Sequence, residues 1–164
     1  MHRNWAVAIS LALSSCAILP PVLVYMPADV PSTTSGGCPS ILEARLFERD
    51  GVALDFVSDP RVRTFGGRYS LLLVVPKGRT AAFLDSRVTI FVPPSANQLT
   101  AQLSCVARPL YSLPRMECTF DAPISDEEVF VVNLPPLEIN GSRYGLDPIR
   151  VSLQKKLVLC WLSA

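Results

Sequence analysis

Residues 68–75 of the chain read RYSLLLVV, and this apolar run predicts more about the fold than any other stretch. A short apolar run bounded by turn residues is typical of a strand at the centre of a sheet. Residues 58–67 before it read as a loop, and Pro76-Lys77-Gly78 after it reads as a turn. We therefore expect residues 68–75 to form a central strand that is buried on both faces.

Other segments alternate apolar and polar residues, which is the period of a half-buried β-strand. The clearest is 87–92 (RVTIFV), in which Val88, Ile90 and Val92 fall on one face. Asp50-Gly51 and Asn140-Gly141 are tight-turn dipeptides, and each predicts a hairpin. Further strands are expected over residues 40–48, 52–57, 99–106, 115–120, 129–134, 149–153 and 157–162.

Together these segments give about eight or nine strands, with no segment of helical period among them. Short strands at such spacing are the pattern of an antiparallel β-sandwich. We therefore predict an all-β domain over residues 38–164, an antiparallel sandwich of immunoglobulin-like architecture. The resemblance is to the architecture alone, because Cys105 and Cys118 are too close in sequence to be the intersheet pair of an antibody domain.

The N-terminal stretch Trp5–Met26 (WAVAISLALSSCAILPPVLVYM) has 22 residues without a charge. As a helix it would be roughly 33 Å long, enough to cross a bilayer core. It favours a transmembrane helix within an anchor over residues 1–26, followed by a flexible linker over residues 27–37. Arg3 precedes the span and Asp29 is the first charge after it, so the N-terminus is expected in the cytoplasm. The expected location is the bacterial inner membrane, with a single span and a periplasmic domain.

Two other interpretations of this stretch remain open. Leu13-Ser14-Ser15-Cys16 resembles a bacterial lipobox, which would make Cys16 the acylated residue of a lipoprotein. Ser15 and Ala17 are small residues at the spacing that a signal peptidase needs, which would place a cleavage after Ala17. Both alternatives give an exported domain without a retained helix.

Five cysteines suggest a disulfide framework in an oxidising compartment. Cys105 and Cys118 lie on neighbouring expected strands, so an antiparallel hairpin would bring them into disulfide range. Cys38 and Cys160 would then pair and join the two ends of the domain. The alternative is that all four are reduced thiols in the core, where cysteine is common.

Composition removes several classes of function. The net charge is +1 at neutral pH, so no strong field attracts nucleic acid. The single histidine is His2, which leaves the domain without the histidine of a Ser-His-Asp triad or of most catalytic zinc sites. We therefore expect no enzymatic activity, no metal, no cofactor and no small-molecule substrate, although catalysis by carboxylates alone remains a minor alternative.

Arginine outnumbers lysine by 12 to 3, and three arginines flank an aromatic residue in one loop. Arg61, Arg63, Phe65 and Arg68 could form a contact patch for a protein or for anionic lipid headgroups. The favoured alternative is that these arginines pair with nearby aspartates, which the sequence suggests are Asp55, Asp59 and Asp85.

The resulting hypothesis is a non-enzymatic accessory subunit of a larger membrane complex, in which respiratory and photosynthetic assemblies are among the possibilities. Its helix would pack against integral membrane subunits and lipid, and its domain would make protein–protein contacts. The alternative is a lipoprotein acylated at Cys16, or a secreted envelope module, that captures a ligand or peptide through a sheet edge.

Overall fold

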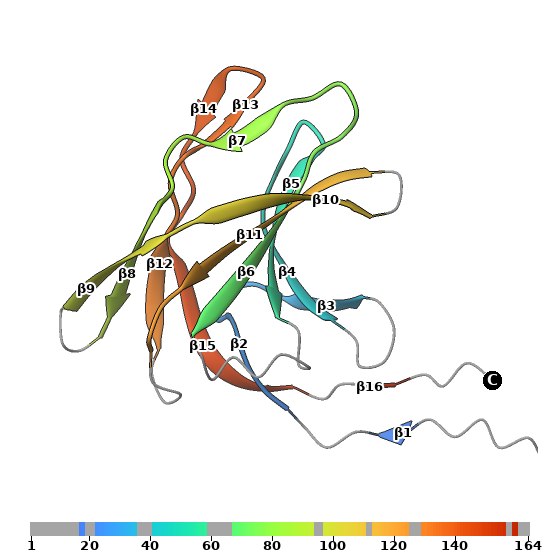
Figure 1. Ribbon diagram of the computed structural model, residues 1–164. Helices are drawn as coiled ribbons and strands as arrows, with labels where there is room; N and C mark the ends of the chain where they lie inside the picture. Colours follow the sequence, from blue (N-terminus) through green and yellow to red (C-terminus); the bar gives the residue numbers. More distant parts are fainter. Residues whose placement is uncertain are drawn as a thin grey trace, which may run out of the picture.

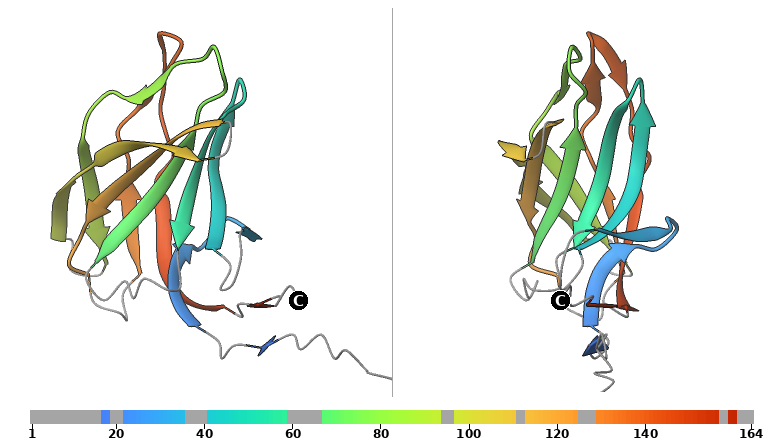
Figure 2. Two further views of the ribbon diagram at one scale, coloured as in Figure 1. Left: turned by 45° about the vertical axis from the view of Figure 1, so that its right-hand side comes forward. Right: turned by 90° about the vertical axis from the view of Figure 1, so that its right-hand side faces the viewer.

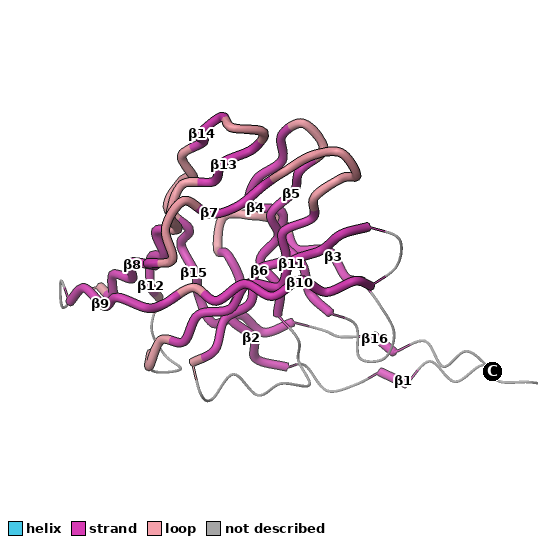
Figure 3. The backbone as a smooth tube through the Cα atoms, turned by 45° about the horizontal axis from the view of Figure 1, so that its top comes forward, coloured by secondary structure: helices cyan, strands magenta, loops and turns pink. Residues whose placement is uncertain are grey.

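The structure is a computed structural model that describes residues 17–18, 22–35, 41–58, 67–93, 97–110, 113–124, 129–156 and 159–160. Every regular element in these ranges is a β-strand, and Figure 3 shows strands and loops with no helix among them. The predicted all-β class is therefore confirmed.

Two larger antiparallel sheets make up most of the fold (Figure 1). The first contains Ser32–Ser35 (β3), Ile41–Arg49 (β4), Val52–Ser58 (β5), Arg68–Val74 (β6), Ser104–Leu110 (β10) and Leu113–Asp121 (β11). Its strand order is β10-β11-β6-β5-β4-β3. The second contains Val22–Pro27 (β2), Arg87–Val92 (β8), Asn97–Gln102 (β9), Phe130–Asn133 (β12) and Ile149–Lys156 (β15). Its order is β2-β15-β12-β8-β9.

Two small antiparallel sheets complete the described elements. Ala81–Phe83 (β7), Leu137–Ile139 (β13) and Ser142–Tyr144 (β14) form a three-stranded sheet in the order β14-β13-β7. Ala17–Ile18 (β1) pairs with Leu159–Cys160 (β16), so segments near the two chain ends lie side by side. Figure 1 shows the small three-stranded sheet at the end of the molecule opposite to β1 and β16.

The two larger sheets face each other across one shared core, as the right-hand view of Figure 2 shows. Aromatic rings connect the layers, because Tyr69 of β6 lies 5.6 Å from Tyr25 of β2 and 5.2 Å from Phe130 of β12 between ring centroids. Both contacts are edge-on, a geometry that aromatic pairs prefer. This arrangement supports the sandwich that the strand spacing predicts.

Both predicted tight turns are confirmed. Asp50 and Gly51 have φ angles of 52° and 78°, and Asn140 and Gly141 have φ angles of 49° and 80°. A two-residue turn of type I′ needs positive φ at both positions, and aspartate, asparagine and glycine accept it at low cost. Each dipeptide therefore joins two paired strands, β4 to β5 and β13 to β14.

The prediction for residues 68–75 is correct about position and wrong about burial. β6 lies in the interior of the six-stranded sheet, between β11 and β5. Tyr69, Leu71 and Leu73 are buried, whereas the residues between them are partly exposed. The second face is open because none of the described strands packs over the outer side of this sheet.

The prediction of a transmembrane helix over residues 1–26 is not supported. Residues 22–27 form β2 and pair with β15, and the buried side chains of Val24, Tyr25 and Met26 belong to the core. Residues 1–16 and 19–21 lie outside the described residues. Helical and strand readings of an apolar run look alike in sequence, and here the pairing partner of the run lies more than 120 residues away.

The linker expected over residues 27–37 also contains ordered structure. Ser32–Ser35 forms β3, which pairs with β4 from Ser32 opposite Ala44 to Ser35 opposite Ile41. Residues 36–40 lie outside the described residues. Within the described ranges no helix is long and apolar enough to cross a bilayer.

Neighbouring residues of β2 provide a test of its place in the core. Met26 is 0% exposed and Leu23 is 64% exposed. We expect Met26→Ala to lower the free energy of unfolding by about 2–5 kcal/mol, because it deletes buried side-chain atoms and leaves a cavity. Leu23→Ala is the matched control and should change stability by no more than about 0.5 kcal/mol. Urea unfolding of the two variants measures this, and equal midpoints would place residue 26 outside the core.

Candidate functional site

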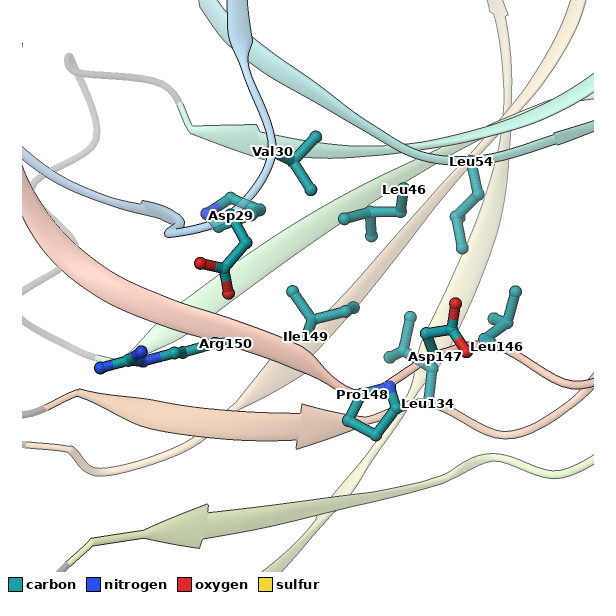
Figure 4. A pocket seen from close by; sticks show the side chains of 11 residues that line it. Asp29, Val30, Leu46, Leu54, Leu134, Leu146, Asp147, Pro148, Ile149 and Arg150 are labelled. Carbon is teal, nitrogen blue, oxygen red and sulfur yellow. The ribbon is translucent and has the colours of Figure 1, made fainter.

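A cleft of about 160 Å³ opens at the side of the sandwich where the chain crosses from β2 to β3 (Figure 4). The link between β14 and β15 forms the opposite wall. The apolar side chains around it come from both larger sheets and from these links: Val30, Leu46, Leu54, Leu134, Leu146 and Ile149. The cleft thus reaches between the two layers of the sandwich.

A β-bulge places one of these side chains. The pairing of β4 with β5 passes from Arg45 opposite Asp55 directly to Phe47 opposite Leu54, so Leu46 has no cross-strand partner. An extra residue bends its strand and redirects its side chain. Leu46 is accordingly half-buried and lines the cleft.

Three charged side chains surround this cleft, and none makes an ion pair within the described residues. Figure 4 shows the carboxylates of Asp29 and Asp147 on opposite sides of the apolar floor and the guanidinium of Arg150 pointing away from it. A small apolar hollow with carboxylates at its rim suits a positively charged group on a short aliphatic or aromatic body.

Two further hollows lie side by side at another edge of the molecule. One of about 460 Å³ lies between the segment 79–81 and the β10–β11 hairpin, and the next, of about 500 Å³, lies between residues 82–86 and the same hairpin. Met116 lines both, so they form one continuous trough. Its walls are mainly apolar, and both volumes fall within the roughly 300–1,000 Å³ that is usual for ligand sites.

The predicted disulfide between Cys105 and Cys118 is present. The two residues are directly opposite on β10 and β11, with their Cα atoms 4.0 Å apart. Cys118 is buried, whereas Cys105 is exposed and lines the trough. Cys38 and Cys16 lie outside the described residues, and only the backbone of Cys160 is described, so the second pairing and the acylation of Cys16 stay predictions.

The arginine patch stays a prediction, because three of its four residues are not described. Arg61, Arg63 and Phe65 lie outside the described residues. Arg68 pairs with Asp121, its Nε donating to Oδ1 at 2.9 Å. The aspartates expected as its partners were therefore the wrong ones, because cross-strand register, rather than nearness in sequence, places Arg68 opposite Asp121.

Asp55 and Asp85, which were expected to pair with the patch arginines, pair with other arginines. Asp55 is 5% exposed and accepts a hydrogen bond from Arg45, directly opposite on β4. That bond raises the pKa of Arg45. Asp85 accepts two hydrogen bonds from the Arg87 guanidinium, at 2.8 and 3.0 Å, which lower the pKa of Asp85. The carboxylate of the Arg45–Asp55 pair is thus buried, whereas the Arg87–Asp85 pair is exposed.

No catalytic constellation assembles in the part of the chain that the structure describes. Within it, no group of three or more histidine, cysteine, aspartate or glutamate residues is placed to hold a metal ion. His2 lies outside the described residues. Sequence reasoning missed the cleft and the trough. Only the bulge in β4 had a signal in the sequence, which is the incomplete alternation of apolar and polar residues.

Comparisons with protein-family models, with characterised proteins and with solved structures found no match for this chain. Function is therefore inferred from the residues and their geometry.

The cross-link provides one stability prediction. Replacing Cys105→Ser together with Cys118→Ala removes a bridge between residues 13 apart in sequence. The chain-entropy model gives about 3 kcal/mol for a loop of this size, so we expect a loss of about that much. Urea unfolding with and without dithiothreitol measures it. An equal urea midpoint of the wild-type protein with and without dithiothreitol would contradict the prediction. A variant whose midpoint still falls in dithiothreitol would indicate a second disulfide.

The exposed ion pairs predict a pH dependence. The hydrogen bond from Arg68 lowers the pKa of Asp121. A carboxyl whose pKa is depressed by folding stabilises the native state above its ordinary pKa of about 4, and this contribution is lost as pH falls through the lower folded value. We therefore expect Asp121→Asn to be less stable than wild type at pH 7 and equal to it near pH 2.

Urea midpoints measured from pH 7 to pH 2 test this effect. Asp147→Asn is the matched control, because Asp147 is an exposed carboxylate with no ion-pair partner within the described residues. The difference between wild type and Asp121→Asn should also shrink in 1 M salt, which screens exposed charges. A difference that persists unchanged at pH 2 would refute the assignment.

Proposed function

We propose that this protein is an exported, non-enzymatic binding module that is attached to a bacterial envelope membrane through an acylated Cys16. The observation that carries the proposal is the start of the sandwich at Val22. Residues 22–27 are part of the folded domain, so only the segment before them is available to the membrane.

The length of that segment favours a signal peptide over a retained span. The uncharged stretch that remains, residues 5–21, has about 17 residues and would measure roughly 25 Å as a helix. A span usually needs about 20 residues, with a range of about 17–25, so this stretch lies at the lower limit. The apolar region of a signal peptide needs only about 7–15 residues. The apolar residues that precede Leu13-Ser14-Ser15-Cys16 fit the second range.

A retained anchor, as in the accessory-subunit hypothesis, would compete with the fold for the same residues. A span that extends to Met26 would withdraw Val24, Tyr25 and Met26 from the core, where they are 3%, 2% and 0% exposed. Burying a large apolar side chain contributes about 1.5–3 kcal/mol, so the loss of three would be severe for a domain of this size. The subunit hypothesis is therefore less well supported than the lipoprotein.

The position of Cys16 also suits lipid attachment. Five residues separate it from β2, and a chain of five extended residues reaches at most about 18 Å. An acyl chain at Cys16 would hold the domain close to the membrane surface. The cleft and the trough would then face the compartment as contact sites, and their mainly apolar linings support a role in binding rather than catalysis.

Intact-mass analysis of the full chain expressed in a bacterium and extracted from its membranes tests the proposal. We expect a species that starts at Cys16 and carries acyl chains, and we expect Cys16→Ser to abolish acylation. Ser10→Ala, also in the N-terminal stretch, is the control and should be processed normally. A species that starts at Met1 would instead support the retained anchor, and an unacylated species that starts at Ile18 would support secretion.

A further inference from the structure

The trough between β7 and the β10–β11 hairpin contains an unused strand edge. β7 is the last strand of its sheet, so one side of it has no neighbouring strand among the described residues. Residues 80 and 84 direct their backbone toward β13, because the N–H of Asn140 donates to the carbonyl of Thr80 at 3.0 Å and the N–H of Leu84 donates to Pro136 at 2.9 Å.

Backbone groups alternate along a strand, so the residues between these two positions face the other way. Ala82 faces β13 like residues 80 and 84, whereas the N–H and C=O groups of Ala81 and Phe83 face the trough. Both residues line the hollows, which puts open space beside these four groups. An edge with unpaired donors and acceptors is a template for another strand.

The wall opposite β7 is apolar and adaptable. Met116 and Ala107 line it, and Cys105 continues it. Methionine fills irregular space easily because its side chain is unbranched and flexible. Leu84 at the rim is 45% exposed. An extended segment that paired with β7 could thus lay every second side chain on an apolar surface.

The charge at one end of the trough specifies its partner further. Arg79 and Arg115 line the end near Ala81, and neither makes an ion pair within the described part of the chain. Among the described residues, none accepts a hydrogen bond from the buried Nε of Arg115. An arginine without an ion-pair partner can bind a carboxylate through its guanidinium N–H groups. At the other end Asp85 is already paired with Arg87.

We propose that the trough binds an extended peptide that adds a fourth strand to the β14-β13-β7 sheet. An apolar side chain of the peptide packs on Met116, and a carboxylate binds Arg79 and Arg115. The free backbone groups of Ala81 and Phe83 favour a peptide over a lipid, because an acyl chain has no groups to pair with them. The proposal rests on the proposed function as a binding module and names the class of partner.

Fluorescence anisotropy with the full-length purified protein tests the proposal. The probe is a labelled octapeptide of alternating valine and threonine that ends in glutamate, and it should bind saturably. The same peptide ending in lysine should bind at least tenfold more weakly. Arg79→Gln and Arg115→Gln should each weaken the glutamate peptide roughly tenfold, as expected for a lost charged hydrogen bond. Arg143→Gln, at an exposed arginine of β14 on the opposite edge of the same small sheet, is the matched control and should bind normally.

Two peptide variants test strand pairing without any risk to the protein fold. N-methyl groups on one alternate set of peptide residues should abolish binding, and N-methyl groups on the other set should preserve it, because only one set faces β7. Equal affinity of both would overturn strand addition. Saturable binding of decanoate, together with no binding of any octapeptide, would show an amphiphile site and overturn the proposal.

Measuring the Cys16→Ser protein in the same assay separates this inference from the proposed function. Peptide binding without acylation in the wild type would overturn the lipoprotein and leave the trough assignment intact. Acylated wild-type protein that shows no anisotropy change with any octapeptide would overturn the trough assignment alone.

Discussion

The aromatic contact of Tyr69 with both Tyr25 and Phe130 is the interaction on which the rest of the structure depends. It joins a strand of the first sheet to two strands of the second. Phe120 of β11, in the first sheet, stacks on Tyr69 with 5.3 Å between the ring centroids. Large rings bury more area than other side chains and fix the geometry of the layers they connect. Because Tyr25 is one of them, the core extends to the first strand of the second sheet.

The burial of β2 in the core limits which residues are available to a membrane. Val24, Tyr25 and Met26 cannot be in the sandwich and in a bilayer at once, so packing sets the boundary of the segment available to a membrane. The proposal of a signal peptide in place of a spanning helix rests on that boundary and not on the hydropathy of the stretch. An apolar run of this kind can form either a membrane helix or a buried strand. Residues 22–27 form a strand because β15 pairs with them.

The two hollows arise where the sheets end. The cleft opens where the chain changes sheets between β2 and β3 and where the bulge at Leu46 interrupts the pairing of β4 with β5. The trough opens because β7 leaves one backbone edge unpaired beside the apolar wall of the β10–β11 hairpin. An open sandwich keeps such edges. Both hollows are bordered by charged side chains that make no ion pair within the described residues.

Sequence by itself determined the all-β class, the turns at Asp50-Gly51 and Asn140-Gly141 and the pairing of Cys105 with Cys118. These depend on residues close together in the chain, where period, turn chemistry and hairpin geometry are local. Tertiary structure alone decided that residues 22–27 form a strand, that Arg68 pairs with Asp121 and that Ala81 and Phe83 face a trough. Each of these depends on a partner distant in sequence, which no local pattern specifies.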